Sequence, residues 1–309
     1  MSRTLPAGIK RDRGEEMKNI LFVIGMPRCA TTSLCNVLGQ HPDIRQGVLK
    51  EPGFFVSSLR LSLHAFNSDG SKVRFSSLGY LETQEDYCKN FGGIEKEGVY
   101  LDGSTIYSLH ISTFIENIKS TQLLDGLDKK FIILHRNQKE RAISHYKFSL
   151  ARGEEFRTFE KALIDECEKI YPNWILGGYL KGGRYDVVAD AITNNFGEES
   201  LLVIDIETDS LFSSECFNKI TSFLGINRYC FDFNVYRNTN IDSNNKLILL
   251  FRVMLKRLRQ LNPTFFEKKF FRYLHGAVMK CFIQKSNLKD SVRDEELRHI
   301  YSKYIDERQ

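Results

Sequence analysis

The sequence lacks any apolar run near the roughly 20 residues that a membrane-spanning helix needs. Its first sixteen residues are polar and charged, without the apolar centre of a secretory signal. These two absences predict a soluble protein of the cytoplasm. Residues 1–18 are expected to be a disordered tail, or else translation begins at Met17, directly before the first apolar strand.

The sequence also lacks paired cysteines. Its seven cysteines are scattered, odd in number and without a C-x-x-C pair, so neither a disulfide framework nor a metal site is predicted. With 42% apolar and 12% aromatic residues, the 309-residue chain can bury a large core. We expect a core domain over residues 19–240 with an insertion near 53–95, and a basic helical extension of the same domain over residues 241–309.

Positive charge is concentrated between Lys246 and Lys285, where ten Lys or Arg accompany one Glu. At residues 246–261, apolar side chains recur at helical spacing with basic side chains on another face, which predicts an amphipathic helix. Such a helix either packs on the domain with a solvated basic face, or contacts an acidic substrate or the inner face of a membrane. No RNA-binding signature accompanies it, so no nucleic-acid partner is predicted.

Short β-rich apolar runs alternate with helical patterns along the chain, which is typical of parallel strands joined by crossover helices. The expected fold class is α/β, a three-layer arrangement with a P-loop-like parallel sheet flanked by helices. Strands are predicted at 20–24, 44–49, 99–101, 130–134 and 201–206, and helices at 31–39, 139–152, 159–170, 185–196 and 216–224.

The first strand runs through Gly25 into a turn and a helix, which brings backbone N–H groups and a positive helix end to one point. The pattern G-x-x-x-x-G-K-[ST] of nucleotide triphosphate sites is incomplete, because Ala30 replaces the second glycine and Thr31 the lysine. Arg28 supplies a cation instead. The alternative is an ordinary strand-to-helix turn with Thr31 or Thr32 as the cap.

Residues 27–34, PRCATTSL, resemble the P-[RK]-S-G-T-T-x-L loop of sulfotransferases that use 3′-phosphoadenosine 5′-phosphosulfate (PAPS). Cys29 and Ala30 depart from the Ser and Gly that are usual there. A thiol at a helix N-terminus beside an arginine is expected to have a lowered pKa, although the favoured role for Cys29 is that of an inert small filler. The resemblance implies that the loop binds the 5′-phosphosulfate through Arg28, Cys29, Ala30, Thr31, Thr32 and Ser33.

Lys50 and Glu51 follow the second strand, so parallel pairing brings them to the sheet edge that carries the loop. A carboxylate there can take the proton of an acceptor hydroxyl, and a cation can neutralise the departing phosphate. Residues 50–55, KEPGFF, also resemble the K-E-P-x-F-F segment of bacterial and heparan-type sulfotransferases, which implies that Glu51 is the base. The alternatives are a plain surface ion pair for Lys50 and Glu51, and His110 as the base.

Residues 135–146 are similar to the family's L-R-D-P-x-x-R-A-x-S-x-Y motif, which binds the 3′-phosphate of PAPS. The resemblance implies that Arg136 and Ser144 are the ligands, and Arg141 is expected on the same helix face as Ser144. Weaker likenesses place Asp102–Tyr107 on the acceptor side and Arg184 and Arg237 near the cofactor.

The resemblance therefore implies an enzyme that moves a sulfuryl group from PAPS to a hydroxyl, without a metal. Glu51 would be the general base, with Arg28 and Lys50 stabilising the leaving phosphate. The expected acceptor is a carbohydrate, as a glycan or glycolipid. Two alternatives stay open: a P-loop kinase, and a catalytically silent module that binds nucleotide or acidic glycan.

Overall fold

The computed structural model describes residues 18–59, 62–66, 72–77, 79–94, 97–151, 155, 157–168, 178–234 and 291–306. Several predictions lie outside these residues. They are the N-terminal tail, the amphipathic helix at 246–261, the basic segment up to Lys285 and the proposed ligand Arg237.

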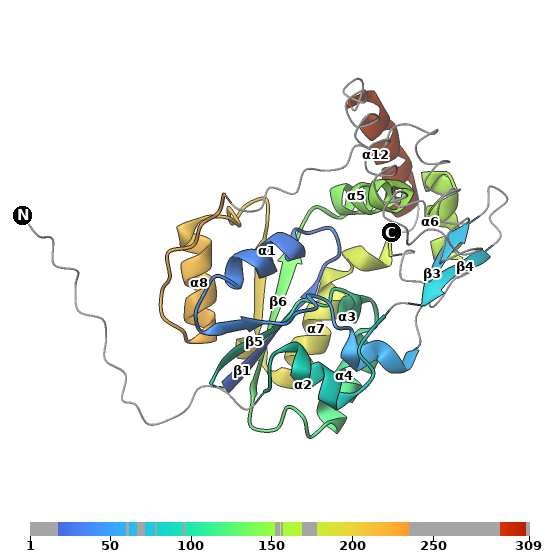
Figure 1. The fold of residues 1–309 in the computed structure, drawn as a ribbon. Helices are drawn as coiled ribbons and strands as arrows, with labels where there is room; N and C mark the ends of the chain where they lie inside the picture. Colours follow the sequence, from blue (N-terminus) through green and yellow to red (C-terminus); the bar gives the residue numbers. More distant parts are fainter. Residues whose placement is uncertain are drawn as a thin grey trace, which may run out of the picture.

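A five-stranded sheet forms the centre of the molecule, in the order β2-β5-β1-β6-β7 (Figure 1). All of its pairings are parallel. The central strand is an unbroken apolar run, as expected of a parallel strand covered on both faces, and its residues 20–24 are 0% exposed. The strands are β1 (Lys18–Gly25), β2 (Ile44–Gln46), β5 (Gly98–Asp102), β6 (Asp128–His135) and β7 (Leu201–Asp205).

Helices cover both faces of this sheet, which confirms the predicted α/β class. Helices α1 (Thr31–Leu38) and α8 (Ser214–Leu224) lie on one face (Figure 1). Helices α3 (Ile106–Leu109), α4 (Ile111–Ser120) and α7 (Tyr185–Phe196) lie on the other. Right-handed crossovers explain why helices lie on both faces. The chain crosses the sheet in one direction from β1 to β2 and in the opposite direction from β6 to β7, so the connecting helices lie on opposite faces.

The expected insertion near 53–95 contains a 3₁₀ helix η1 (Phe54–Leu59), an antiparallel hairpin of β3 (Ser62–Phe66) and β4 (Lys72–Ser77), and helix α2 (Gln84–Asn90). Strand β2 ends at Gln46 rather than at Leu49. The cause is Asn90, whose backbone carbonyl accepts from Val48 N at 2.9 Å and whose Oδ1 accepts from Leu49 N at 2.7 Å. These bonds replace further pairing with the sheet.

A second, smaller core joins α5 (Gln138–Ala151), α6 (Phe159–Cys167) and the C-terminal helix α12 (Ser291–Asp306). Leu297 and Tyr301 of α12 are buried in it. Arg298 forms an ion pair with Glu140 of α5 at 2.6 Å. The described end of the predicted C-terminal extension therefore packs on the helix that follows β6. Two short 3₁₀ helices, η2 (Lys181–Gly183) and η3 (Glu198–Ser200), flank α7.

Candidate active site

The loop between β1 and α1 takes a path that L-residues rarely adopt. Arg28 has φ of 73° and Ala30 has φ of 62°, both in the left-handed region. Met26 N donates to Leu134 O at 3.2 Å, and Cys29 N donates to Met26 O at 3.1 Å, which fixes the turn. The first turn of α1 follows at once, and its N–H groups have no partners within the helix. This arrangement favours an anion.

The left-handed backbone at Ala30 explains why glycine is usual at this position of the loop. A β-carbon there costs on the order of 1 kcal/mol. We therefore expect Ala30→Gly to raise the free energy of unfolding by about 1 kcal/mol, measured by urea denaturation. The control is Ala191→Gly in the right-handed helix α7, which should lower it by about 1 kcal/mol. A decrease in both variants would contradict the strain at Ala30.

Lys50 and Glu51 lie beside this loop. Lys50 Nζ donates to Thr31 Oγ1 at 3.3 Å and pairs with Glu51 Oε1 at 2.7 Å. Thr105 Oγ1 donates to the other carboxylate oxygen, Oε2, at 3.2 Å. The Glu51 side chain is 40% exposed and that of Lys50 is 18% exposed. The carboxylate is thus held from two sides while it stays open to solvent.

The loop also meets the residues that follow β6. Arg28 Nε donates to Ser144 Oγ at 3.4 Å, although the two residues are 116 positions apart. Arg136 Nη1 donates to the carbonyl oxygen of Arg28 at 3.2 Å. The Arg28 guanidinium lies over the Phe148 ring, 4.3 Å from its centroid. Burial, and then the charge of Arg136, lower the pKa of Arg28. An anion bound between two such cations would relieve their repulsion.

The prediction of a lowered pKa for Cys29 is wrong. Burial raises the pKa of this thiol, despite the nearby Tyr185 hydroxyl and two arginines. Its Sγ lies 3.6 Å from the Tyr185 hydroxyl. That hydroxyl donates to Arg136 O at 2.8 Å and accepts from Arg136 N at 3.3 Å. Tyr185 therefore ties the loop to the end of β6, a role that its place beside Arg184 in the sequence did not reveal.

Arg141 shares the helix of Ser144 but supports the loop from the interior. It is 0% exposed. Its guanidinium donates to Pro27 O at 3.4 Å, to Gly178 O at 2.7 Å and to Tyr179 O. Because these acceptors are backbone carbonyls, Arg141 holds residues 178–179 against the loop between β1 and α1.

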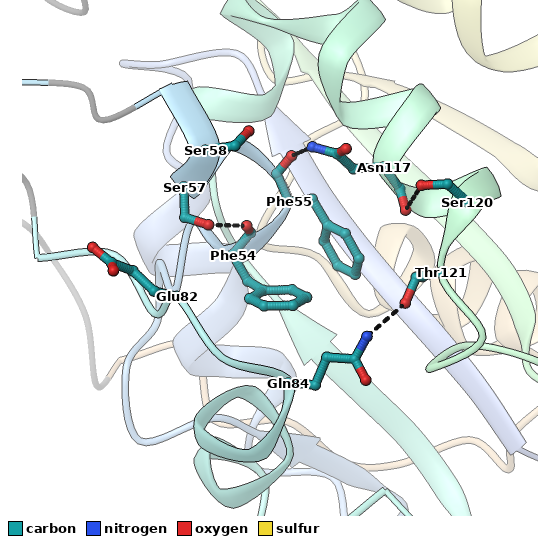
Figure 2. Close-up of a pocket in the computed structure, with 9 residues that line it drawn as sticks. All are labelled: Phe54, Phe55, Ser57, Ser58, Glu82, Gln84, Asn117, Ser120 and Thr121. Atoms are coloured by element: carbon teal, nitrogen blue, oxygen red, sulfur yellow. Dashed lines mark hydrogen bonds between the residues drawn. The ribbon is translucent and has the colours of Figure 1, made fainter.

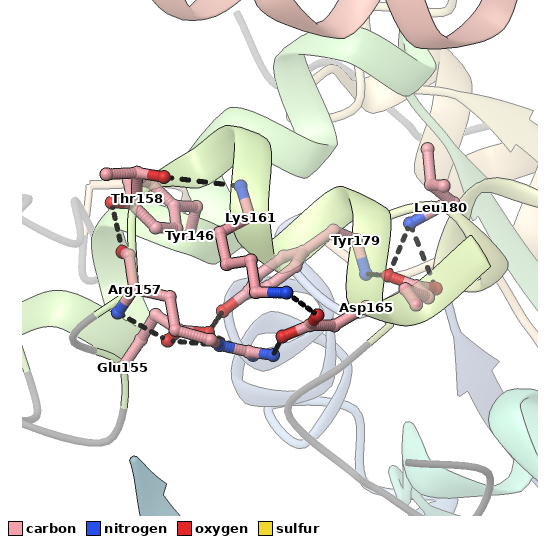
Figure 3. Close-up of polar contacts among 9 residues, drawn as sticks. Tyr146, Glu155, Arg157, Thr158, Lys161, Asp165, Tyr179 and Leu180 are labelled. Carbon is pink, nitrogen blue, oxygen red and sulfur yellow. Dashed lines mark hydrogen bonds and ion pairs between the residues drawn. The ribbon is translucent and has the colours of Figure 1, made fainter. Parts of the chain in front are cut away.

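The segment that Arg141 contacts is held in turn by helix α6. The Glu166 carboxylate accepts from the backbone N–H groups of Tyr179 at 2.8 Å and of Lys181 at 2.7 Å. Nearby, Arg157 forms ion pairs with Glu155 at 2.6 Å and with Asp165 at 2.7 Å (Figure 3). The Tyr179 hydroxyl donates to Glu155 at 3.1 Å. This buried network fixes the support of the loop.

Within the described residues, the side chains of Arg184 and His110 form no hydrogen bond or ion pair with the residues around Arg28. The exposed Arg184 guanidinium pairs with Asp186, in the first turn of α7, at 3.4 Å. The Nε2 atom of His110 is buried and has no hydrogen-bond partner within the described residues. Burial, and then the charge of Lys181, lower the pKa of His110 to about 4, so the ring is neutral near pH 7.

An open pocket of about 270 Å³ lies beside η1, between the start of α2 and the end of α4 (Figure 2). Phe54, Glu82 and Asn117 are among its lining residues. Two hydrogen bonds join some of its lining residues: Gln84 Nε2 donates to Thr121 Oγ1 at 3.4 Å, and Asn117 Nδ2 donates to Phe55 O at 2.7 Å. None of the residues that line this pocket is a lysine or an arginine, so the cations at the loop lie outside it.

In the part of the chain that the structure describes, no group of three or more His, Cys, Asp or Glu is placed to hold a metal ion. Within the same residues, no helix is both long and apolar enough to cross a bilayer.

The fold and the loop together define an α/β protein whose first strand–helix turn, at the carboxyl edge of the sheet, has the geometry that favours an anion. The particular form is the sulfotransferase fold. A sulfotransferase from Alicyclobacillus acidocaldarius superimposes with a TM-score of 0.57 and 24% sequence identity, over 78% of this chain and 94% of that one.

Two more distant structures are also sulfotransferases. Mouse sulfotransferase SULT7A1, complexed with PAP, has a TM-score of 0.41 and 15% identity over 77% of this chain and 65% of its own. A sulfotransferase domain from the curacin biosynthetic pathway has a TM-score of 0.39 and 13% identity, over 75% and 79%. No protein-family model matches the sequence, and a search of curated proteins found no match.

Proposed function

We propose that this protein is a PAPS-dependent sulfotransferase that moves a sulfuryl group to an acceptor hydroxyl. The proposal rests on the convergence of three separate motifs at one loop. Lys50 contacts Thr31 at 3.3 Å, and Ser144 contacts Arg28 at 3.4 Å. A phosphate-binding turn alone would fit many nucleotide proteins. The turn with a carboxylate on one side and an arginine–serine pair on the other fits PAPS.

The residues present fit the two anionic ends of this co-substrate. The turn at Arg28 to Ser33 offers backbone N–H groups and a guanidinium to a 5′-phosphosulfate. Arg136 and Ser144 offer a cation and a hydroxyl to a 3′-phosphate. PAPS supplies a sulfuryl group that is already activated by its bond to a phosphate. The protein's task is to bind it, to orient the acceptor and to move one proton.

Glu51 is the proposed general base. Its carboxylate is oriented by Thr105 at 3.2 Å and by Lys50 at 2.7 Å, and its partial exposure leaves room for an acceptor. Glu51 takes the hydroxyl proton as the acceptor oxygen attacks sulfur. Lys50 and Arg28 stabilise the charge that develops on the departing phosphate. Arg184, and Arg237 outside the described residues, are proposed as further cofactor contacts.

The proposed acceptor is a carbohydrate, as a glycan or glycolipid. The similarity of residues 50–55 to the heparan-type segment supports this class. The basic segment up to Lys285 would attract an acidic glycan or the inner face of a membrane, which is consistent with a cytoplasmic protein.

The test is incubation of the purified protein with radiolabelled PAPS and with pools of glycans and glycolipids. We expect transfer of label to an acceptor, and loss of that transfer in Arg28→Ala. Persistent transfer in Arg28→Ala would refute the assignment of the loop. ATP turnover without sulfuryl transfer would instead identify a kinase. Binding of PAP without any transfer would identify a silent module.

A further inference from the structure

The turn after β5 is hydrogen-bonded to the segment that carries Glu51. Three consecutive residues of this turn each make one contact with residues 50–53. Gly103 N donates to Lys50 O at 3.0 Å, and Thr105 Oγ1 donates to Glu51 Oε2 at 3.2 Å. Between them, Ser104 Oγ accepts from Gly53 N at 3.0 Å. The position of Glu51 is thus set by a neighbouring strand as well as by its own.

A buried carboxylate anchors this turn. Asp102 is 0% exposed and is the last residue of β5. Its Oδ1 accepts from Ser104 N at 3.0 Å and from Ser104 Oγ at 2.6 Å. Its Oδ2 accepts from the hydroxyls of Tyr87 at 3.0 Å and Tyr107 at 2.9 Å. One oxygen therefore faces the active-site turn, and the other faces the aromatic core.

The Ser104 hydroxyl links the anchor to the base segment. It donates to Asp102 and accepts from Gly53, so the two bonds form a relay from a charged group to a backbone N–H. Gly53 has φ of 60°, and the Tyr80 ring occupies the space where a β-carbon would stand. Leu81 N donates to Pro52 O at 2.9 Å on the same side. The turn directly after Glu51 is therefore held between Ser104 and residues 80–81.

We propose that Asp102 and Ser104 are positioning residues that hold Glu51 in place for the sulfuryl transfer, an inference that rests on the proposed function. Neither residue contacts the reacting atoms. They act through Gly53, because loss of the Ser104 hydroxyl would free the backbone two residues after the base. A displacement of about 1 Å in a catalytic group can cost on the order of a hundredfold in rate.

The two oxygens of Asp102 supply a matched pair of variants. Ser104→Ala removes the hydroxyl that serves Gly53, and Tyr87→Phe removes a hydroxyl that serves only the core side. We expect Ser104→Ala to lower kcat by about tenfold to a hundredfold, with the affinity for PAP unchanged. Tyr87→Phe should keep kcat within about twofold. An equal decrease in both variants, or unchanged kcat in Ser104→Ala, would overturn the proposal.

A second measurement does not depend on catalysis. Hydrogen exchange at the Gly53 amide should be slow in the wild type and in Tyr87→Phe, and fast in Ser104→Ala. Slow exchange in Ser104→Ala would overturn the relay even if kcat fell. A wild-type protein that transfers no sulfuryl group would refute the proposed function, whereas the exchange at Gly53 would still test the relay.

Discussion

Glu51→Gln is expected to lower kcat for sulfuryl transfer by about 10²–10⁴-fold while the affinity for PAP stays unchanged. Glutamine keeps the shape of the side chain and can still accept the hydrogen bond from Thr105. It cannot take a proton from the acceptor hydroxyl. The measurement combines label transfer at saturating PAPS with calorimetric titration of PAP, so that loss of chemistry is separated from loss of binding.

The control for this variant is Glu82→Gln, at an exposed glutamate that lines the pocket beside Phe54. It removes the same charge without touching the loop and should leave kcat within about twofold. If Glu51→Gln retained kcat at the wild-type level, Glu51 would not be the base. The neutral His110 would then be the next residue to substitute.

Arg136→Ala is expected to weaken PAP binding by about 10–100-fold, which corresponds to the loss of a charge-assisted hydrogen bond. The affinity for adenosine 5′-phosphosulfate, which has no 3′-phosphate, should change far less. The physical reason is that Arg136 and Ser144 are proposed to bind only the 3′-phosphate. Calorimetry with both nucleotides measures the difference directly.

A matched arginine is available at Arg45, which bonds Glu97 O at 3.2 Å on the edge strand β2. Arg45→Ala should leave both affinities unchanged. Equal weakening of both nucleotides in Arg136→Ala would show that this residue only supports Arg28, whose carbonyl oxygen it contacts at 3.2 Å. The assignment of the 3′-phosphate site would then be wrong.

Local patterns were sufficient to predict most of the sheet. Helix α7 agrees with its predicted range in full, and β5 and β6 contain theirs. Short apolar runs that alternate with helices indicate a parallel sheet, and this pattern can be recognised without knowing which distant residues pack together. The hairpin of β3 and β4 was not predicted, because residues 53–90 have weak periodicity. The end of β2 was predicted three residues too late, because only the tertiary structure brings Asn90 to its backbone.

Sequence patterns are sufficient to predict the strand, the turn and the helix from Asn19 to Leu38, and the position of Lys50 at the same edge of the sheet. The spacing of apolar residues and the residues of the turn are local features of the sequence. The position of Lys50 follows from the general rule that parallel strands end at the same edge of a sheet. The raised pKa of Cys29 depends on the tertiary structure, because the thiol is buried beside Tyr185, a residue 156 positions away in the sequence. The tertiary structure also decided that Arg141 supports the loop and that Asp102 anchors the Glu51 segment. Burial and hydrogen-bond partners depend on what the rest of the chain packs against each side chain, and no local pattern contains that.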